Sequence, residues 1–208
     1  MANVCSIMDG TGRVVGTYRK THLPNAVDED YSEAGVLEAG RSLEPIQTSL
    51  GRIGCLICYD ICFPEAAMCY ALAGAEILLH PSVGYAFPDE EESTAEARLR
   101  ARASDAQVPL LYANFGHEAR RPPSRSCVID ASGTVVANAG NASEVVVFAD
   151  VEVGGVRLRD WSWKGYDHRR WLAAKRRPDL YGLLVKGVPP LLAGWVPPRP
   201  VSRSDPGA

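Results

Sequence analysis

The sequence lacks a long apolar run, an excess of basic residues and the spread of cysteines that is typical of secreted domains. No stretch approaches the ~18 apolar residues that span a membrane, and the first residues show neither part of a signal peptide. We therefore expect a cytoplasmic protein that contacts no membrane. The net charge of −3 argues against a broad nucleic-acid surface. A content of 46% hydrophobic and 23% charged residues excludes disorder as the main state.

The cysteines are concentrated rather than spread. Cys55, Cys58, Cys62 and Cys69 lie in one short stretch, which does not fit a disulfide framework. A structural zinc site of the usual kind requires a second matching pair elsewhere in the chain, and the sequence has none. A thioredoxin-like redox pair opens a helix, whereas Cys55 falls inside an expected strand. We expect no metal and no cofactor.

Strand and helix signals alternate along the chain. Residues 5–8 and 14–18 predict a hairpin around Asp-Gly-Thr-Gly, and 126–130 with 134–137 predict a second one. Further strands are expected at 52–57, 76–79, 108–113 and 144–153, and helices at 64–73 and 91–105. This order indicates an α/β fold with a mixed sheet, in one domain over 1–187. A proline-rich tail follows at 188–208. The basic residues near 169–177 are expected to form a solvated helix face.

The segment 51–65, Gly-Arg-Ile-Gly-Cys-Leu-Ile-Cys-Tyr-Asp-Ile-Cys-Phe-Pro-Glu, is the most informative one. It predicts a buried strand, then a cysteine at a sharp turn, then a helix that begins near Pro64. This arrangement is the thiol counterpart of a nucleophile elbow, and it indicates Cys58 as the nucleophile. Cys55 and Cys62 fit the alternative of small buried thiols better. A papain-like pair of Cys58 with His80 is a further alternative, although His80 fits a strand end better.

A thiol needs a cation or a base nearby to become a nucleophile at neutral pH. Lys20, directly after the first hairpin in Tyr-Arg-Lys-Thr-His-Leu-Pro, is the candidate cation. The alternative is an ordinary surface charge or an edge-strand lysine that prevents aggregation.

Together these two motifs resemble the carbon–nitrogen hydrolase (nitrilase) superfamily. The resemblance continues through 74–82, 100–103, 112–114, 126–138 and 176–181, so it covers nearly the whole chain up to the tail. It implies an αββα sandwich, a Glu–Lys–Cys catalytic triad and pairing of subunits as a homo-oligomer. Cys58-Tyr59-Asp60 resembles amidases that act on small amides or carbamoyl compounds.

The resemblance assigns roles residue by residue. Cys58 matches the nucleophile, Lys20 the catalytic lysine, and the backbone N–H of Tyr59 an oxyanion donor. Glu33 best matches a glutamate that supports the lysine, with Glu29 as the alternative. Pro81, Ser82 and Tyr85 follow the next strand, where they either line the substrate pocket or serve as turn residues.

One part of the family pattern is missing. The resemblance places the general-base glutamate on a strand well before the lysine motif, and no glutamate of this chain matches it. We therefore expect an N-terminally truncated form that lacks about a third of a typical domain. The complete form would release ammonia from a small amide. The alternative is an inactive fragment that acts, if at all, as a structural or partner subunit. For the 208 residues alone we expect little activity and poor solubility.

Overall fold

The computed structural model describes residues 1–24, 33–83, 92–115, 125–140, 142, 144–154, 167–187, 191 and 194. Its first element is a hairpin in which β1 (Val4–Met8) and β2 (Val14–Arg19) pair antiparallel. Asp9 in the turn accepts hydrogen bonds from the backbone N–H groups of Thr11 and Arg13, at 2.9 and 3.1 Å. Such contacts are the reason that Asp favours turns. The predicted first hairpin is confirmed.

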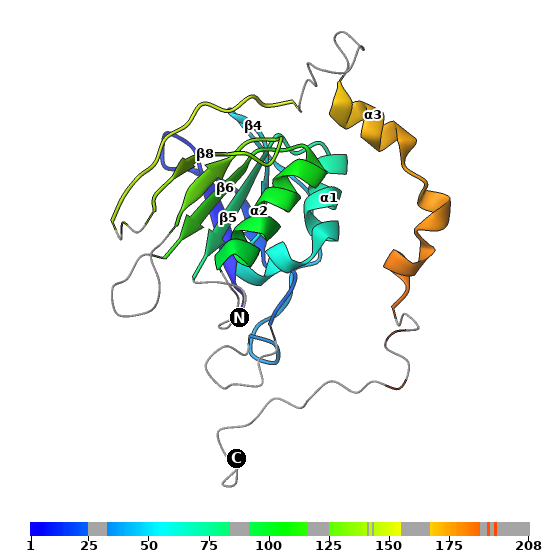
Figure 1. Cartoon of the computed structure of the whole chain (residues 1–208). Helices are drawn as coiled ribbons and strands as arrows, with labels where there is room; N and C mark the ends of the chain where they lie inside the picture. The colour runs from blue at the N-terminus through cyan, green and yellow to red at the C-terminus, as the bar shows by residue number, and fades with distance from the viewer. Residues whose placement is uncertain are drawn as a thin grey trace.

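A six-stranded mixed sheet forms the centre of the molecule (Figure 1). In spatial order its strands are β3 (Ile46–Thr48), β4 (Gly51–Cys55), β5 (Ile77–Ser82), β6 (Leu110–Asn114), β7 (Cys127–Ile129) and β8 (Val135–Asn138). β4, β5 and β6 run parallel, and the other neighbours are antiparallel. The helices α1 (Pro64–Leu72) and α2 (Glu92–Ala106) connect the parallel strands.

The elements are stacked in layers. Figure 1 shows α1 and α2 side by side on one face of the sheet, with the β1–β2 hairpin behind it. The order helices, six-stranded sheet, two-stranded sheet confirms the α/β class and gives three layers of the expected αββα arrangement.

Local signals account for the helix boundaries. Pro64 is the first residue of α1, where its missing N–H costs no hydrogen bond. Gly74 follows that helix with φ at +87°, a conformation that glycine adopts without strain. The predicted strands at 52–57, 76–79 and 108–113 and the second hairpin correspond to β4, β5, β6 and the β7–β8 pair.

The observed strands differ from the predicted ones in two places. β3 was not expected, because three residues with polar Gln47 and Thr48 give little β signal; it forms by pairing with β4. The strand expected at 144–153 is wrong, since no described strand pairs with this segment. Val146 and Phe148 are 73% and 85% exposed there. A β-branched and aromatic run forms a strand only when a neighbour covers it.

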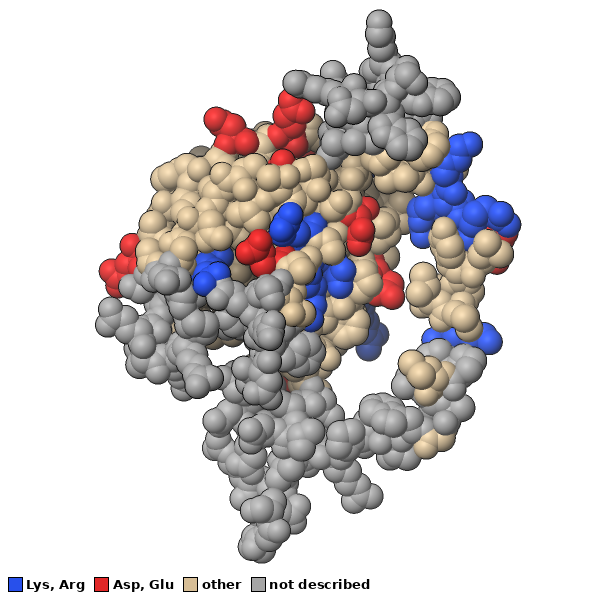
Figure 2. All heavy atoms as spheres, in the orientation of Figure 1, with Lys and Arg blue, Asp and Glu red and all other residues tan. Residues whose placement is uncertain are grey.

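The C-terminal part of the chain stands apart from the sheet. It contains α3 (His168–Lys175) and the short 3-10 helices η3 (Pro178–Leu180) and η4 (Gly182–Val185), none with a buried residue. Lys and Arg atoms gather over α3 in Figure 2. Arg169 nevertheless donates hydrogen bonds to the backbone oxygens of Ala71 and Ala75, at 2.5 and 2.7 Å. The expectation of a wholly solvated basic face is therefore wrong for Arg169, which ties α3 to the end of α1.

The proposed tail at 188–208 lies outside the described residues except for Leu191 and Gly194, so the domain boundary stays a prediction. Of the helices that the structure describes, none is both long and apolar enough to span a bilayer.

A glycine in β4 lets α1 approach the sheet. A Cβ atom built on Gly54 would lie 2.8 Å from the Tyr70 ring and 2.8 Å from Leu78. Both neighbours are fully buried, at 1% and 0% exposed, so neither can move aside freely.

We expect Gly54→Ala to lower the free energy of unfolding by about 1–3 kcal/mol, the usual cost of overpacking. Urea unfolding followed by circular dichroism measures the change. Gly10→Ala is the matched control, because nothing lies within 4 Å of a Cβ at Gly10. Equal stability of the two variants would contradict the close packing described.

Candidate active site

The turn after β4 holds Cys58 in an unusual backbone conformation. β4 ends at Cys55, and a 3-10 helix, η2 (Cys58–Cys62), leads into α1. Cys58 is half-buried and has φ at +47°, in the left-handed region that non-glycine residues seldom adopt. Such strain costs roughly 1–3 kcal/mol and is typical of functional sites. The predicted strand–turn–helix arrangement is confirmed.

Lys20 is buried next to a carboxylate. It follows β2 directly and is 1% exposed, so the alternative of a surface charge is wrong. Its Nζ lies 2.5 Å from Glu33 Oε2, and Asn3 Nδ2 donates to Glu33 Oε1 at 2.8 Å. The structure thus brings together two of the predicted site residues and adds Asn3, which the sequence did not indicate. Glu29 lies outside the described residues.

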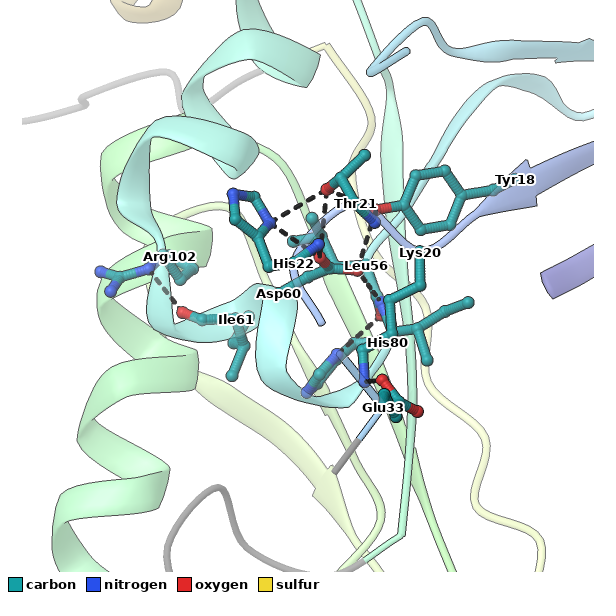
Figure 3. Close-up of polar contacts among 11 residues, drawn as sticks. Tyr18, Lys20, Thr21, His22, Glu33, Leu56, Asp60, Ile61, His80 and Arg102 are labelled. Atoms are coloured by element: carbon teal, nitrogen blue, oxygen red, sulfur yellow. Dashed lines mark hydrogen bonds and ion pairs between the residues drawn. The ribbon is translucent and has the colours of Figure 1, made fainter. Parts of the chain in front are cut away.

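A buried carboxylate joins the lysine segment to the cysteine turn. Asp60 of η2 is 0% exposed and accepts five hydrogen bonds (Figure 3). Their donors are Tyr18 Oη (2.8 Å), Thr21 Oγ1 (3.1 Å), the backbone N of His22 (2.9 Å), His22 Nδ1 (2.8 Å) and the backbone N of Ile57 (2.8 Å).

These donors keep Asp60 ionised. Burial by itself would raise its pKa, but the hydrogen bonds from His22 and Ile57 bring the pKa below its ordinary value. The His22 ring also stacks on Phe63, with centroids 3.9 Å apart, and this fixes the ring that faces the carboxylate.

His80 of β5 is buried under the same turn. Its Nδ1 lies 2.8 Å from the Leu56 backbone oxygen, and its ring stacks on Tyr112 at 5.2 Å. Burial lowers the pKa of His80 to about 4, so the ring is neutral at pH 7 and donates to Leu56. His80 therefore supports the residues before Cys58. It lies inside β5, which continues to Ser82, so the expectation that it caps a strand end is wrong. Among the described residues, no hydrogen bond joins His80 to Cys58.

The helix face opposite η2 also supports the turn. Arg102 of α2 donates to the backbone oxygens of Ile61 and Cys62, at 3.0 and 3.4 Å.

Pro81 and Ser82 are the last residues of β5 and lie just beyond the end of its pairing with β4. The carboxyl ends of parallel strands form the usual edge for a ligand. Tyr85 lies outside the described residues.

Two other thiols lie near each other behind the turn. Cys55 Sγ donates to Cys5 Sγ across 3.9 Å. This hydrogen bond lowers the pKa of Cys5 to about 7, whereas the same bond together with burial raises the pKa of Cys55. Cys55 is thus the buried thiol that the sequence indicated, and it faces the first hairpin.

The Cys58 thiol has no hydrogen-bond partner among the described residues. Glu33 is engaged with Lys20 and Asn3. That no glutamate of the chain matches the family's general base stays a prediction.

Comparisons with known proteins agree on the family. The family model for carbon-nitrogen hydrolases matches residues 1–159. Deaminated glutathione amidase from Homo sapiens is 35% identical over 185 residues, which cover 86% of this chain and 54% of that protein. The chain thus spans about half the length of this relative.

Solved structures show the same fold. The carbon-nitrogen hydrolase from Helicobacter pylori superposes with a TM-score of 0.72 at 26% identity, covering 89% of this chain and 66% of that one. A glutamate-to-glutamine mutant of an amidase from Nesterenkonia, with acrylamide added to its active-site cysteine, gives 0.55 at 26% identity, covering 66% and 52%. A family match over most of its length, with this fold, establishes that the chain belongs to the carbon-nitrogen hydrolase family.

Proposed function

We propose that this chain carries the nucleophile and oxyanion-binding part of a thiol amidase that releases ammonia from a small amide or carbamoyl compound. The observation that carries the proposal is Cys58, held in the left-handed region at a strand–helix turn. The buried Lys20 on the adjoining segment supports it.

The chemistry follows from these groups. The Cys58 thiolate forms a bond to the amide carbon, and the carbonyl electron pair moves onto oxygen. The Lys20 ammonium and the Tyr59 backbone N–H stabilise that oxyanion, an interaction that often contributes most to the rate. The carbon–nitrogen bond then breaks, and the nitrogen takes a proton from water and leaves as ammonia. A further water molecule hydrolyses the thioester, which releases the carboxylic acid and regenerates the Cys58 thiol. Glu33 holds the Lys20 side chain in place.

The substrate class is inferred from the residues next to Cys58 and from its motif. Pro81 and Ser82 end the neighbouring parallel strand, and we assign them, with Tyr85, to the pocket wall. The Cys58-Tyr59-Asp60 motif resembles that of amidases for small amides and carbamoyl compounds. The proposal also includes a cytoplasmic location and self-association.

Ammonia release by the 208-residue chain tests the proposal. With propionamide we expect slow release, because a missing general base typically costs about 10²–10⁴-fold. We also expect an acyl group on the Cys58 peptide in mass spectra, since thioester hydrolysis needs the same base. Cys58→Ala should reduce both signals to background.

Cys62→Ala is the matched control, because Cys62 lies in the same 3-10 helix but does not take part in the proposed chemistry. Ammonia release from Cys58→Ala equal to that of the wild-type chain would refute the proposal.

A second candidate function is that of a partner subunit without activity of its own. It is favoured by apolar side chains on the outer face of the β1–β2 hairpin, where Val4, Met8 and Val14 are 50–63% exposed. Such a face is typical of a protein–protein contact or of aggregation. Sedimentation of the chain and of a Val4→Thr, Met8→Gln variant tests whether this face makes the contact: we expect the wild-type chain to self-associate and the variant to do so less. The ammonia assay above then distinguishes an active subunit from an inactive one.

A further inference from the structure

We propose that Asp60 is a positioning residue, which holds the segment that carries Lys20 against the turn that carries Cys58. This inference rests on the proposed function, because Lys20 and Cys58 are the groups that it aligns. Asp60 itself touches no reacting atom; it acts through the two segments that it joins.

Asp60 anchors the segment around Lys20. Tyr18 and Thr21, which lie on either side of Lys20, both donate side-chain hydrogen bonds to Asp60. His22 adds its backbone N and its ring. The chain around Lys20 is therefore fixed at three positions by a single carboxylate (Figure 3).

Asp60 also anchors the turn that carries Cys58. Ile57 N donates to Asp60 Oδ2 at 2.8 Å, and Asp60 N donates to Ile57 O at 3.0 Å. These two reciprocal hydrogen bonds enclose Cys58. A strained residue persists only when its surroundings over-determine its conformation, and this pair of contacts supplies that constraint.

An amide cannot replace the carboxylate. The five donors require an acceptor at both oxygens, and asparagine has one acceptor and one NH₂ group of nearly the same shape. Whichever way the side chain turns, its NH₂ faces a donor: the Ile57 N–H on one side or the His22 N–H on the other. Asp60→Asn should therefore release one of the two segments.

The ratio of two alkylation rates at Cys58 measures the alignment. Iodoacetamide reacts by displacement at carbon and reports thiolate content and access. Acrylamide adds the thiolate to its terminal carbon, and charge develops on its amide oxygen, where Lys20 and Tyr59 N–H would act. Dividing the acrylamide rate by the iodoacetamide rate removes the effects of thiolate content and general loosening. The Nesterenkonia amidase mutant shows that acrylamide can reach such a cysteine.

We expect the ratio for the wild-type chain to exceed that for free N-acetylcysteine, and Asp60→Asn to lower it about tenfold, since small misplacements of a catalytic group cost up to 10²-fold. Rates are read by tandem mass spectrometry from fragment ions that localise the added group to Cys58, because Cys55 and Cys62 lie in the same peptide. Asp130→Asn is the matched control: Asp130 also accepts several hydrogen bonds, at 2.6–3.0 Å, but in the distant β7–β8 turn.

The possible results distinguish a failure of the proposed function from a failure of the positioning role of Asp60. A wild-type ratio equal to that of N-acetylcysteine would reject the oxyanion site and with it the proposed function. A raised wild-type ratio that Asp60→Asn leaves unchanged would overturn the positioning role alone. If Asp60→Asn does not fold, Tyr18→Phe removes one of the donors, and we expect it to lower the ratio about threefold, the effect of one hydrogen bond. An unchanged ratio in that variant overturns the positioning role as well.

Discussion

Replacing Glu33 by Gln is expected to lower the free energy of unfolding by about 3 kcal/mol, because the substitution leaves the buried Lys20 ammonium without an anion. Among the described residues, Glu33 is the only hydrogen-bond partner of Lys20 Nζ. The Lys20 side chain is 2% exposed and that of Glu33 24%. Water can therefore reach the glutamate but not the lysine. Urea unfolding at pH 7 measures the loss.

Because Lys20 is buried and Glu33 is partly exposed, two further variants serve as controls. Lys20→Met added to Glu33→Gln should recover most of the lost stability, because an apolar side chain tolerates the buried position. Glu38→Gln breaks the exposed pair with Arg19 (3.3 Å, side chains 75% and 49% exposed), and should cost less than about 1 kcal/mol. If Glu33→Gln is no more costly than Glu38→Gln, the buried pair does not stabilise the fold as described.

Acidification from pH 7 to pH 4 is expected to destabilise the chain by about 3 kcal/mol through His80, since each unit of pKa difference corresponds to about 1.4 kcal/mol. The pKa of His80 is about 4 in the folded chain, against an ordinary value of 6.5. Below pH 6.5 the unfolded chain binds a proton that the folded chain excludes. Stability from this group is therefore complete above pH 6.5 and decreases down to about pH 4.

Unfolding in urea at a series of pH values from 7 to 4 measures this dependence. His80→Asn should flatten the curve, because an amide keeps a donor for the Leu56 oxygen but does not titrate in this range. His168→Asn on α3 is the control and should retain the wild-type slope. Protonation of Asp60 also destabilises the folded chain. Because the pKa of Asp60 is lowered, this loss of stability occurs at more acid pH. A His80→Asn variant with the wild-type slope would contradict the assignment.

The sequence predicted those features that depend on neighbouring residues. Proline at position 64, glycine at 74 and the Asp-Gly turn at 9–10 act within a few residues, and the elements that they delimit are confirmed. The left-handed turn at Cys58 belongs to the same class, since its motif predicted the strand–turn–helix arrangement.

Features that depend on distant partners were not predictable in the same way. Asp60 and His22 stood in the motifs, yet nothing local shows that their side chains meet. Arg169 was expected to be one solvated arginine among several, because its acceptors at Ala71 and Ala75 lie far back in the chain. The expected strand at 144–153 failed for the same reason: its composition favoured a strand, but no described strand pairs with it.

The hydrogen bonds of Asp60 also concern the order of folding. Tyr18 and His22 are 42 and 38 positions away from Asp60 along the chain, so the loop between them must close before either contact forms. Closing such a loop costs conformational entropy that a local turn does not, and contacts of this range slow folding. We therefore expect Cys58 and Lys20 to be aligned only late in folding, after the hairpin has docked on the sheet. The reactivity of Cys58 thus reports on completed assembly, and a partly folded chain would carry an ordinary thiol.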